Sequence, residues 1–213
     1  MIATSMLARV RELIDEVSSS FWTDSNLYIA LSEAQRQLVN LSLATYKMKL
    51  LMNPSEPLPE VLRPLYEEVA NLAFGTTGVS SVALPADFLF DLHVEYDDNS
   101  SAPIPAYKIG ITPNRKFSLS NTYLGSNQSQ FYYWIDDENL NFGTVVSGTG
   151  SYRLTYLKKP TEIDATPTNP VLPTFTHEAL CQYAVAEALK KDKEYQAAQI
   201  FYNTFLQLAQ NFI

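Results

Sequence analysis

Two residue types that can carry nucleophilic chemistry lie four positions apart near the C-terminal end of the chain. His177 and Cys181 fall about one turn apart in a stretch that reads as helical, so they could meet as a base and a thiol nucleophile. Residues 176–178 also have the composition of a first helical turn, and Cys181 has apolar neighbours in Leu180 and Ala184. We therefore favour a structural interpretation, in which Cys181 is a small buried residue beside a capping turn.

Paired carboxylates are the second candidate for chemistry. Asp87 with Asp91, or the run Asp136, Asp137 and Glu138, could supply the acid and base of a glycoside hydrolase or the ligands of a calcium ion. The run lies between two segments with strand composition, and Asp87 stands at the entry to another. We therefore interpret Asp137 and Glu138 as solvating a hairpin turn and Asp87 as a strand-entry residue.

The residue types give little support to metal or nucleotide chemistry. The chain has two histidines and one cysteine, too few for a zinc site without carboxylates from elsewhere. The stretch 143–150 lacks the strand-and-helix context of a dinucleotide-binding loop, and no P-loop lysine motif is present. We expect no catalytic residues, no metal and no cofactor, and a protein that is not an enzyme.

The charge of the chain argues against general binding to nucleic acid or anionic lipid. The 15 lysines and arginines against 23 acidic residues give a net charge of −8, so no broad cationic surface is available to neutralise phosphates. A lone cysteine forms no internal disulfide, and charged residues interrupt the apolar runs, so we expect neither a signal peptide nor a membrane span. The expectation is a soluble protein made in the cytoplasm.

The best-marked element is a helix that begins at residue 24. Thr23 stands where an N-cap belongs, and Asp24 places a negative charge at the positive end of the helix dipole. Phe21 and Trp22 precede the cap and are expected to form a hydrophobic staple onto the first turn. An apolar stripe recurs at three- and four-residue steps at Leu27, Leu31, Ala34, Leu38 and Leu41. Gln35 is expected at the surface. The polar residues that fall mostly off this stripe are Ser32, Glu33, Gln35, Arg36 and Gln37.

Periodicity along the rest of the chain predicts helices first, then strands, then helices again. Helices are expected over 5–17, 24–53, 60–73, from Thr174 or Thr176 onward, and after a turn at 190–193. Strands are expected over 88–96, 104–109, 130–135, 140–142 and 152–157. Within the first strand, one face is expected to carry Phe88, Phe90, Leu92, Val94 and Tyr96.

These elements predict an α+β fold, in which N- and C-terminal helices form one bundle and an antiparallel β-rich unit of about five strands is inserted between them. The segments are expected to be N-terminal helices over 1–75, the inserted unit over 76–160, a Pro-rich connection over 161–173, and a C-terminal helical pair over 174–213.

Three motifs, in this order along the chain, resemble the head-to-tail adaptor, or connector, proteins of tailed bacteriophages. The first is the Phe-Trp-Thr-Asp opening with its signature residues Trp22, Thr23 and Asp24, followed by a Leu-rich helix that ends Glu-Ala-Gln-Arg-Gln-Leu-Val. The second is Leu-Pro-Ala-Asp-Phe at 84–88, with Pro85 and Asp87. The third is the helical pair that contains residues 184–192.

The resemblance implies a structural virion protein at the neck between capsid and tail. Such adaptors form a ring, commonly of twelve copies, below the portal protein and extend the DNA channel toward a downstream neck or tail protein. DNA would pass through without specific binding, because an acidic lumen repels phosphate. The chain ends on large apolar groups, so partner contacts are expected at Phe205, Leu208, Phe212 and Ile213.

Two alternatives stay open. Another ring component of the phage neck or tail tube would have the same helix-plus-sheet build. A carbohydrate-binding β module with helical appendages is the alternative from another class, since Tyr132, Tyr133 and Trp134 could stack on sugar rings. Strand alternation argues against those three rings as one flat platform, because neighbours on a strand point to opposite faces.

Overall fold

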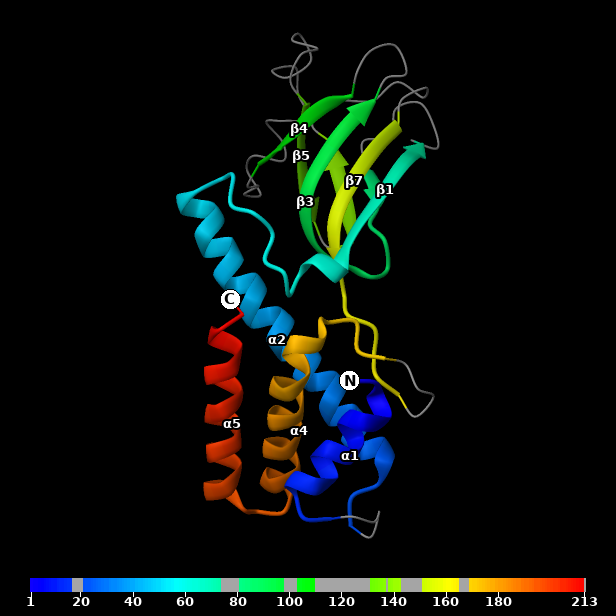
Figure 1. Ribbon diagram of the computed structural model, residues 1–213. Helices are drawn as coiled ribbons and strands as arrows, with labels where there is room; N and C mark the ends of the chain where they lie inside the picture. The colour runs from blue at the N-terminus through cyan, green and yellow to red at the C-terminus, as the bar shows by residue number, and fades with distance from the viewer. Residues whose placement is uncertain are drawn as a thin grey trace. The chain divides into compact units, whose positions relative to one another are not determined.

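The computed structural model describes residues 1–16, 21–73, 81–97, 103–109, 131–136, 138–142, 151–164 and 169–212. The chain divides into two compact units. The helical unit comprises Met1–Leu65 and Lys159–Ile213, and the sheet unit comprises Tyr66–Lys158. The fold is α+β, with helices from both ends of the chain packed together and a sheet inserted in sequence between them, as the sequence predicted (Figure 1).

The helical unit is organised around α4. Its helices are α1 (Ala3–Leu13), α2 (Asp24–Met52), α4 (His177–Lys191) and α5 (Tyr195–Gln210), with short 3-10 turns at Arg63–Leu65 and Thr174–Thr176. Helix α4 contacts α1, α2 and α5 (Figure 1). Small side chains let the neighbouring helices approach it closely, and those that are buried include Ala179, Cys181, Ala184, Ala186 and Ala188.

The first helix ends earlier than the sequence predicted. Helix α1 stops at Leu13, and Asp15 adopts a left-handed φ of 55°. The amide of Glu16 then bonds the carbonyl of Arg11 over 3.0 Å, which closes the helix end. Helix α2, predicted over 24–53, is confirmed, and its 29 residues make it about 43 Å long at about 1.5 Å per residue.

The sheet unit is a single mixed sheet of seven strands. The strands are β1 (Tyr66–Ala73), β2 (Ser81–Ala83), β3 (Phe88–Asp97), β4 (Ile104–Lys108), β5 (Phe131–Asp136), β6 (Asn139–Phe142) and β7 (Ser151–Lys158). Their spatial order is β1-β7-β3-β4-β5-β6-β2. The five predicted strands are confirmed, but β4 and β5 pair in parallel, so the fully antiparallel arrangement was wrong.

The helix predicted over 60–73 is also wrong, because most of this segment forms strand β1. Its residues have good helical propensity, but β1 pairs with β7, placing Tyr66 opposite Leu157 and Ala73 opposite Ser151. Charged pairs reinforce the register, since Lys158 lies 3.0 Å from Glu67 across the two strands. Pairing with a strand that is distant in sequence overrides local propensity here.

Strand β3 does not keep the simple alternation that its sequence predicts. Its pairing with β7 is irregular between Phe88 and Phe90 and again between Asp91 and His93. Val94 is fully buried as expected, but Asp91, expected on the opposite face, is also buried at 7% exposure. Such irregularities reverse which face a side chain occupies, so a period-two pattern cannot be followed through them.

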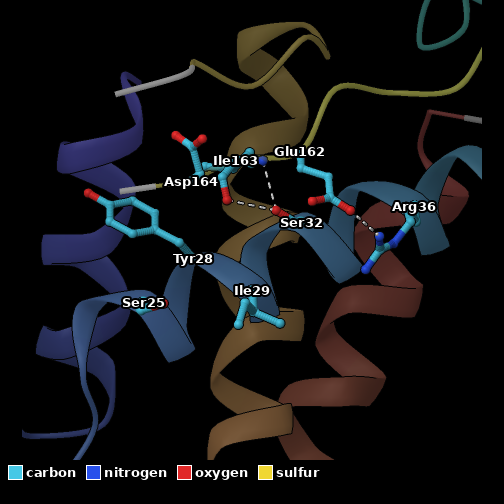
Figure 2. Close-up of a pocket in the computed structure, with 8 residues that line it drawn as sticks. All are labelled: Ser25, Tyr28, Ile29, Ser32, Arg36, Glu162, Ile163 and Asp164. Atoms are coloured by element: carbon cyan, nitrogen blue, oxygen red, sulfur yellow. Dashed lines mark hydrogen bonds and ion pairs between the residues drawn. The ribbon is translucent and has the colours of Figure 1, made fainter. Parts of the chain in front are cut away.

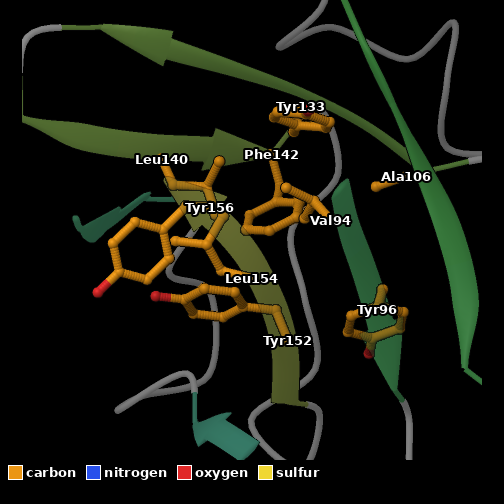
Figure 3. Packing of buried hydrophobic residues seen from close by; sticks show 9 residues of the cluster. All are labelled: Val94, Tyr96, Ala106, Tyr133, Leu140, Phe142, Tyr152, Leu154 and Tyr156. Carbon is orange, nitrogen blue, oxygen red and sulfur yellow. The ribbon is translucent and has the colours of Figure 1, made fainter. Parts of the chain in front are cut away.

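Aromatic side chains fill the core of the sheet unit. Tyr152, Tyr156 and Phe142 converge from β7 and β6, and the Phe142 and Tyr152 ring centroids lie 5.9 Å apart (Figure 3). Phe88 stacks on Tyr156 at 5.8 Å. Because both sides of this core come from one curled sheet, large rings are needed to span its interior.

Candidate functional site

The side chains of Ser32 and Gln35 on α2 bind the backbone that returns from the sheet to the helices. The Ser32 hydroxyl donates to the carbonyl of Ile163 over 2.9 Å and accepts from its amide over 2.8 Å. Gln35 donates to the carbonyl of Thr161 over 2.8 Å and accepts from the amide of Val171 over 3.0 Å. We call residues 161–164 and 169–172 the return segment, and these two side chains are its main polar attachment to α2.

The surface placement predicted for Gln35 is therefore wrong, and Ser32, which lies off the apolar stripe, is buried as well. Ser32 is 5% exposed and Gln35 only 1%. Both lie three positions apart on the face of α2 that the return segment covers, and each satisfies backbone groups that would otherwise lie buried without partners. Arg36, one position on, stays exposed and pairs with Glu162 at 3.1 Å.

A hollow of about 150 Å³ opens beside this junction (Figure 2). Ser25, Tyr28 and Ile29 line it from α2, together with Ser32 and Arg36, and residues 162–164 of the return segment complete it. The Ile29 side chain is 57% exposed, and the carboxyl groups of Glu162 and Asp164 stand on the other side. The hollow thus combines an apolar side chain with acidic groups, and it is too small for a drug-sized ligand.

Two signature residues at the start of α2, Trp22 and Asp24, bind a buried cation, Arg11, for which the residue pattern predicts no role. Arg11 is 8% exposed and donates to the carbonyl of Trp22 over 2.8 Å and to the carboxylate of Asp24 over 2.5 Å. The predicted N-cap is confirmed, because Thr23 accepts from the amide of Asn26 over 3.3 Å. The staple expected of Phe21 is wrong, since that side chain is 64% exposed.

His177 and Cys181 each have structural partners. The Nε2 of His177 lies 3.0 Å from the carbonyl of Leu172, and its Nδ1 lies 2.8 Å from the amino group of Met1. A donor at Nε2 and an acceptor at Nδ1 make this a neutral imidazole, and burial lowers the pKa of His177. Cys181 is buried against the carbonyl of Met6, and burial raises the pKa of its thiol to about 12. A thiol with that pKa is a poor nucleophile near neutral pH.

The acidic candidates in the sheet unit are also held by structural contacts. Asp91 pairs with Lys108 at 2.5 Å and accepts from the hydroxyl of Tyr133 over 2.7 Å. Burial, and then the nearby Asp91 charge, raise the pKa of Tyr133. Asp87 accepts from the hydroxyl of Tyr156 over 2.9 Å at the entry to β3. Pro85 makes the turn there, because its carbonyl accepts from the amide of Phe88 over 2.9 Å.

The remaining chemical candidates lie in the same sheet. Asp136 opposes Asn139 in the β5–β6 hairpin, as expected for a turn, while Asp137 lies outside the described residues. Tyr133 is buried in the core, whereas Tyr132 faces Tyr107 at 6.2 Å. The three successive rings at 132–134 therefore do not form one platform.

The expected partner-binding residues near the C-terminus differ in exposure. Phe205 is fully buried against the rings of Tyr183 and Tyr202. Leu208 and Phe212 are half-buried, and Phe212 packs on Phe175 at 5.2 Å. Ile213 lies outside the described residues.

A groove of about 460 Å³ separates the C-terminal parts of two helices in the helical unit. Leu41, Thr45 and Lys49 line it from α2, and Leu206, Ala209 and Gln210 line it from α5. Its walls are largely apolar.

Neither a metal-binding cluster nor a membrane-spanning helix is found in the described part of the chain. In that part, no three or more histidine, cysteine or acidic side chains gather where they could hold a metal ion. None of the helices described is both long and apolar enough to cross a bilayer.

Comparison with known families identifies the family of this chain. The model of the SU10 adaptor protein family matches residues 1–211, which is nearly the whole chain. The chain belongs to the SU10 adaptor family. A search of curated proteins finds no match. Membership confirms the resemblance seen in the sequence: this is a phage virion adaptor, and a structural family of this kind implies a non-enzymatic role.

Proposed function

We propose that this SU10-family adaptor forms an oligomeric ring below the portal protein and continues the DNA channel toward the next neck or tail component. The observation that carries the proposal is the family match over residues 1–211. The chemistry of the described residues agrees with a structural role, because His177, Cys181, Asp87 and Asp91 are each engaged in contacts that stabilise the fold.

The acidity of the chain fits a channel component. Each chain has a net charge of −8, and a ring, commonly of twelve copies in such adaptors, would multiply that charge. Acidic groups facing the lumen would repel phosphate, so that DNA slides through without specific binding. The protein would be made in the host cytoplasm and end in the virion, at the neck between capsid and tail.

Portal contact is assigned to the apolar end of the chain, at Leu208, Phe212 and Ile213. Phe212 and Phe175 form a half-covered aromatic pair at 5.2 Å, and Phe175 itself is 44% exposed. A partner that covered this pair would bury two large rings at once, and such aromatic anchors often dominate binding energy. Phe205 is fully buried against the rings of Tyr183 and Tyr202, so it belongs to the core of the helical unit.

The decisive experiment images the purified full-length chain alone and mixed with portal rings. We expect a ring of adaptors on the portal, and no salt-sensitive binding of duplex DNA. A chain that binds DNA with micromolar affinity, or never joins the portal, would contradict the proposal. Association with tail-tube protein in place of portal would favour the other neck or tail component, and binding in a glycan screen would favour the carbohydrate module.

Matched variants test the portal surface. Phe212→Ala, or removal of residues 210–213, should leave a folded protein with weaker portal binding. Phe205→Ala is the control for stability, because deleting a fully buried ring costs about 3–5 kcal/mol. If Phe212→Ala lowered the melting temperature as much as Phe205→Ala and left portal binding unchanged, the C-terminal end would be part of the core and not a docking element.

A further inference from the structure

Strand β4 exchanges one neighbouring strand for the other part-way along its five residues. The register partners of Ile104 and Pro105 lie in β3, whereas those of residues 106–108 lie in β5. In the described strands, no residue of β4 is in register with both neighbours. A strand that passes from one set of strands to another in this way forms a corner between two layers.

The corner divides the sheet unit into two layers that face each other. The first layer contains β1, β7 and β3, and the second contains β5, β6 and β2. Figure 3 shows the core between them, where Phe142 and Leu140 of β6 meet Tyr152 and Leu154 of β7. This packing is apolar and therefore non-directional, so directional contacts between the layers have to come from β4 and from polar side chains.

A buried carboxylate supplies such a contact beyond the corner. Asp91 of β3 pairs with Lys108 of β4 and accepts from the hydroxyl of Tyr133 of β5 over 2.7 Å. Lys108 and Tyr133 lie opposite each other where β4 has left β3 for β5, so both contacts run from the second layer to the first. The pairing of β3 with β7 is irregular between Asp91 and His93, and such irregularities can turn a side chain to the other face.

Backbone pairing within each layer is continuous over longer stretches than the pairing of β4. In the first layer, β3 and β7 are paired from Phe88 opposite Lys158 to Asp97 opposite Ser151. In the second layer, β5 and β6 are paired over residues 133–136 and 139–142. Proteins open in cooperative units that often coincide with such paired strands, so each layer is expected to persist when the contacts between the layers break.

We propose that the sheet unit opens at the β4 corner by separation of its two layers, and that Asp91, by binding Lys108 and Tyr133, is the latch that keeps the layers closed. Opening breaks the short pairing of β4 with β3 and exposes the aromatic core, while the strands within each layer stay paired. Segments that rearrange when a partner binds are drawn from the parts of a protein that open most readily. The second layer is such a part, and this inference does not depend on the proposed ring.

Thiol labelling of the full-length chain measures this opening. Val94→Cys places a thiol in the core between the layers, where Val94 is fully buried. An alkylating reagent should label this thiol slowly in the native protein, as peptide mass spectrometry can follow. Adding Asp91→Ala should speed the labelling by about tenfold or more, because it leaves Lys108 and Tyr133 without their partner.

Two controls accompany the labelling. Glu95→Ala, also on β3, removes a partly exposed ion pair with Arg153 and should change the rate by no more than about twofold. Cys181 lies in the helical unit, so Asp91→Ala should leave its labelling rate unchanged. Leu140→Cys places the thiol on the β6 side of the same core and repeats the test if Val94→Cys disturbs the fold.

Amide hydrogen exchange separates opening of the layers from unfolding of the whole sheet unit. The amides of β7 stay paired with β1 and β3 when only the layers separate, so the introduced thiol should become accessible at least about tenfold more often than the amides of β7. Equal opening frequencies for the thiol and for β7 would show that the unit opens as a whole, and would overturn the corner. A labelling rate that Asp91→Ala raised no more than Glu95→Ala would overturn Asp91 as the latch.

Discussion

Ser32 and Ile163 form a reciprocal pair, in which one helical hydroxyl satisfies both backbone groups of a residue in the return segment. The hydroxyl donates to the Ile163 carbonyl over 2.9 Å and accepts from its amide over 2.8 Å, and both contacts are buried. The pair acts as a side-chain substitute for strand pairing, and it fixes where the chain re-enters the helical unit after the sheet.

Ser32→Ala should therefore destabilise the helical unit by about 2–3 kcal/mol, because it leaves the amide and carbonyl of Ile163 without partners. Urea unfolding followed by Trp22 fluorescence measures this, in a Trp134→Phe background that leaves Trp22 as the one tryptophan. Ser25→Ala, an exposed change on the same helix, should stay within about 0.5 kcal/mol. Equal effects of the two changes would contradict the role of Ser32.

Gln35→Ala should cost a similar amount, because Gln35 is 1% exposed and bonds both Thr161 and Val171. Combined with Ser32→Ala, the loss should be smaller than the sum, since both side chains hold the same return segment and the first change partly releases it. The same fluorescence assay measures the free energy of unfolding of the two single variants and of the double variant. The control is Gln37→Ala, which removes a contact to Glu33. Strict additivity would show that the two attachments act independently.

The sequence was sufficient to predict the helices with clear caps and stripes and the strands with clear alternation. It placed α2 to within a residue of its ends because Thr23 and Asp24 mark the start and prolines follow the end. It missed β1 because the only reason for 66–73 to be extended is its pairing with β7. It misplaced the buried face of β3 because strand irregularities are not visible in composition.

The polar attachments of the helical unit were missed for a different reason. Periodicity sorts residues by apolarity, so it placed Ser32 and Gln35 off the apolar stripe and predicted no role for Arg11. Each of these side chains is buried because it donates a hydrogen bond to a backbone or carboxylate oxygen of another segment. A usable signal existed in the sequence of residues 160–173, where four prolines predict an extended backbone with no strand to pair with.

The stability of the helical unit should fall as the pH drops through the range below about 6.5, the usual pKa of histidine. Burial is the main cause that lowers the pKa of His177 in the folded chain, and the adjacent Met1 amino group lowers it by a smaller amount. The unfolded chain therefore binds the proton more readily than the folded chain. Denaturant unfolding between about pH 5.5 and 7.5 gives the slope of the free energy of unfolding against pH. A single titrating group can contribute at most about 1.4 kcal/mol per pH unit to this slope.

His177→Gln should flatten that slope, because an amide does not titrate, yet it can still offer a donor and an acceptor to Leu172 and Met1. His93→Gln is the control, since His93 lies exposed in the sheet unit and this change should leave the slope in place. A slope that persisted in His177→Gln would assign the pH dependence to other groups.

Cys181 should resist thiol reagents in the native protein near neutral pH. Its thiol is fully buried and burial raises its pKa to about 12, so almost no thiolate is present and the reagent has no access. Because Cys181 is the one cysteine in the chain, any labelling of the protein reports exposure of this thiol when the helical unit opens. Labelling with a chromogenic disulfide, with and without urea, measures this. Full reaction of the native chain as fast as of the unfolded chain would contradict the packing of α4.

Asp91→Ala should destabilise the sheet unit by about 3 kcal/mol, which is large for a single polar change. The carboxylate is buried, pairs with Lys108 and accepts from the Tyr133 hydroxyl, so its removal leaves a cation and a buried phenol without their partner. Asp91→Asn should cost less, because the amide oxygen can still accept from Tyr133 while only the charge is lost.

The control is Glu95→Ala, which removes a half-exposed ion pair with Arg153 and should cost about 1 kcal/mol or less. Trp134 fluorescence in a Trp22→Phe background follows this unit alone. If Asp91→Ala cost no more than Glu95→Ala, the buried carboxylate would be dispensable, and the aromatic core around Tyr133 would hold the register of β3, β4 and β5 without it.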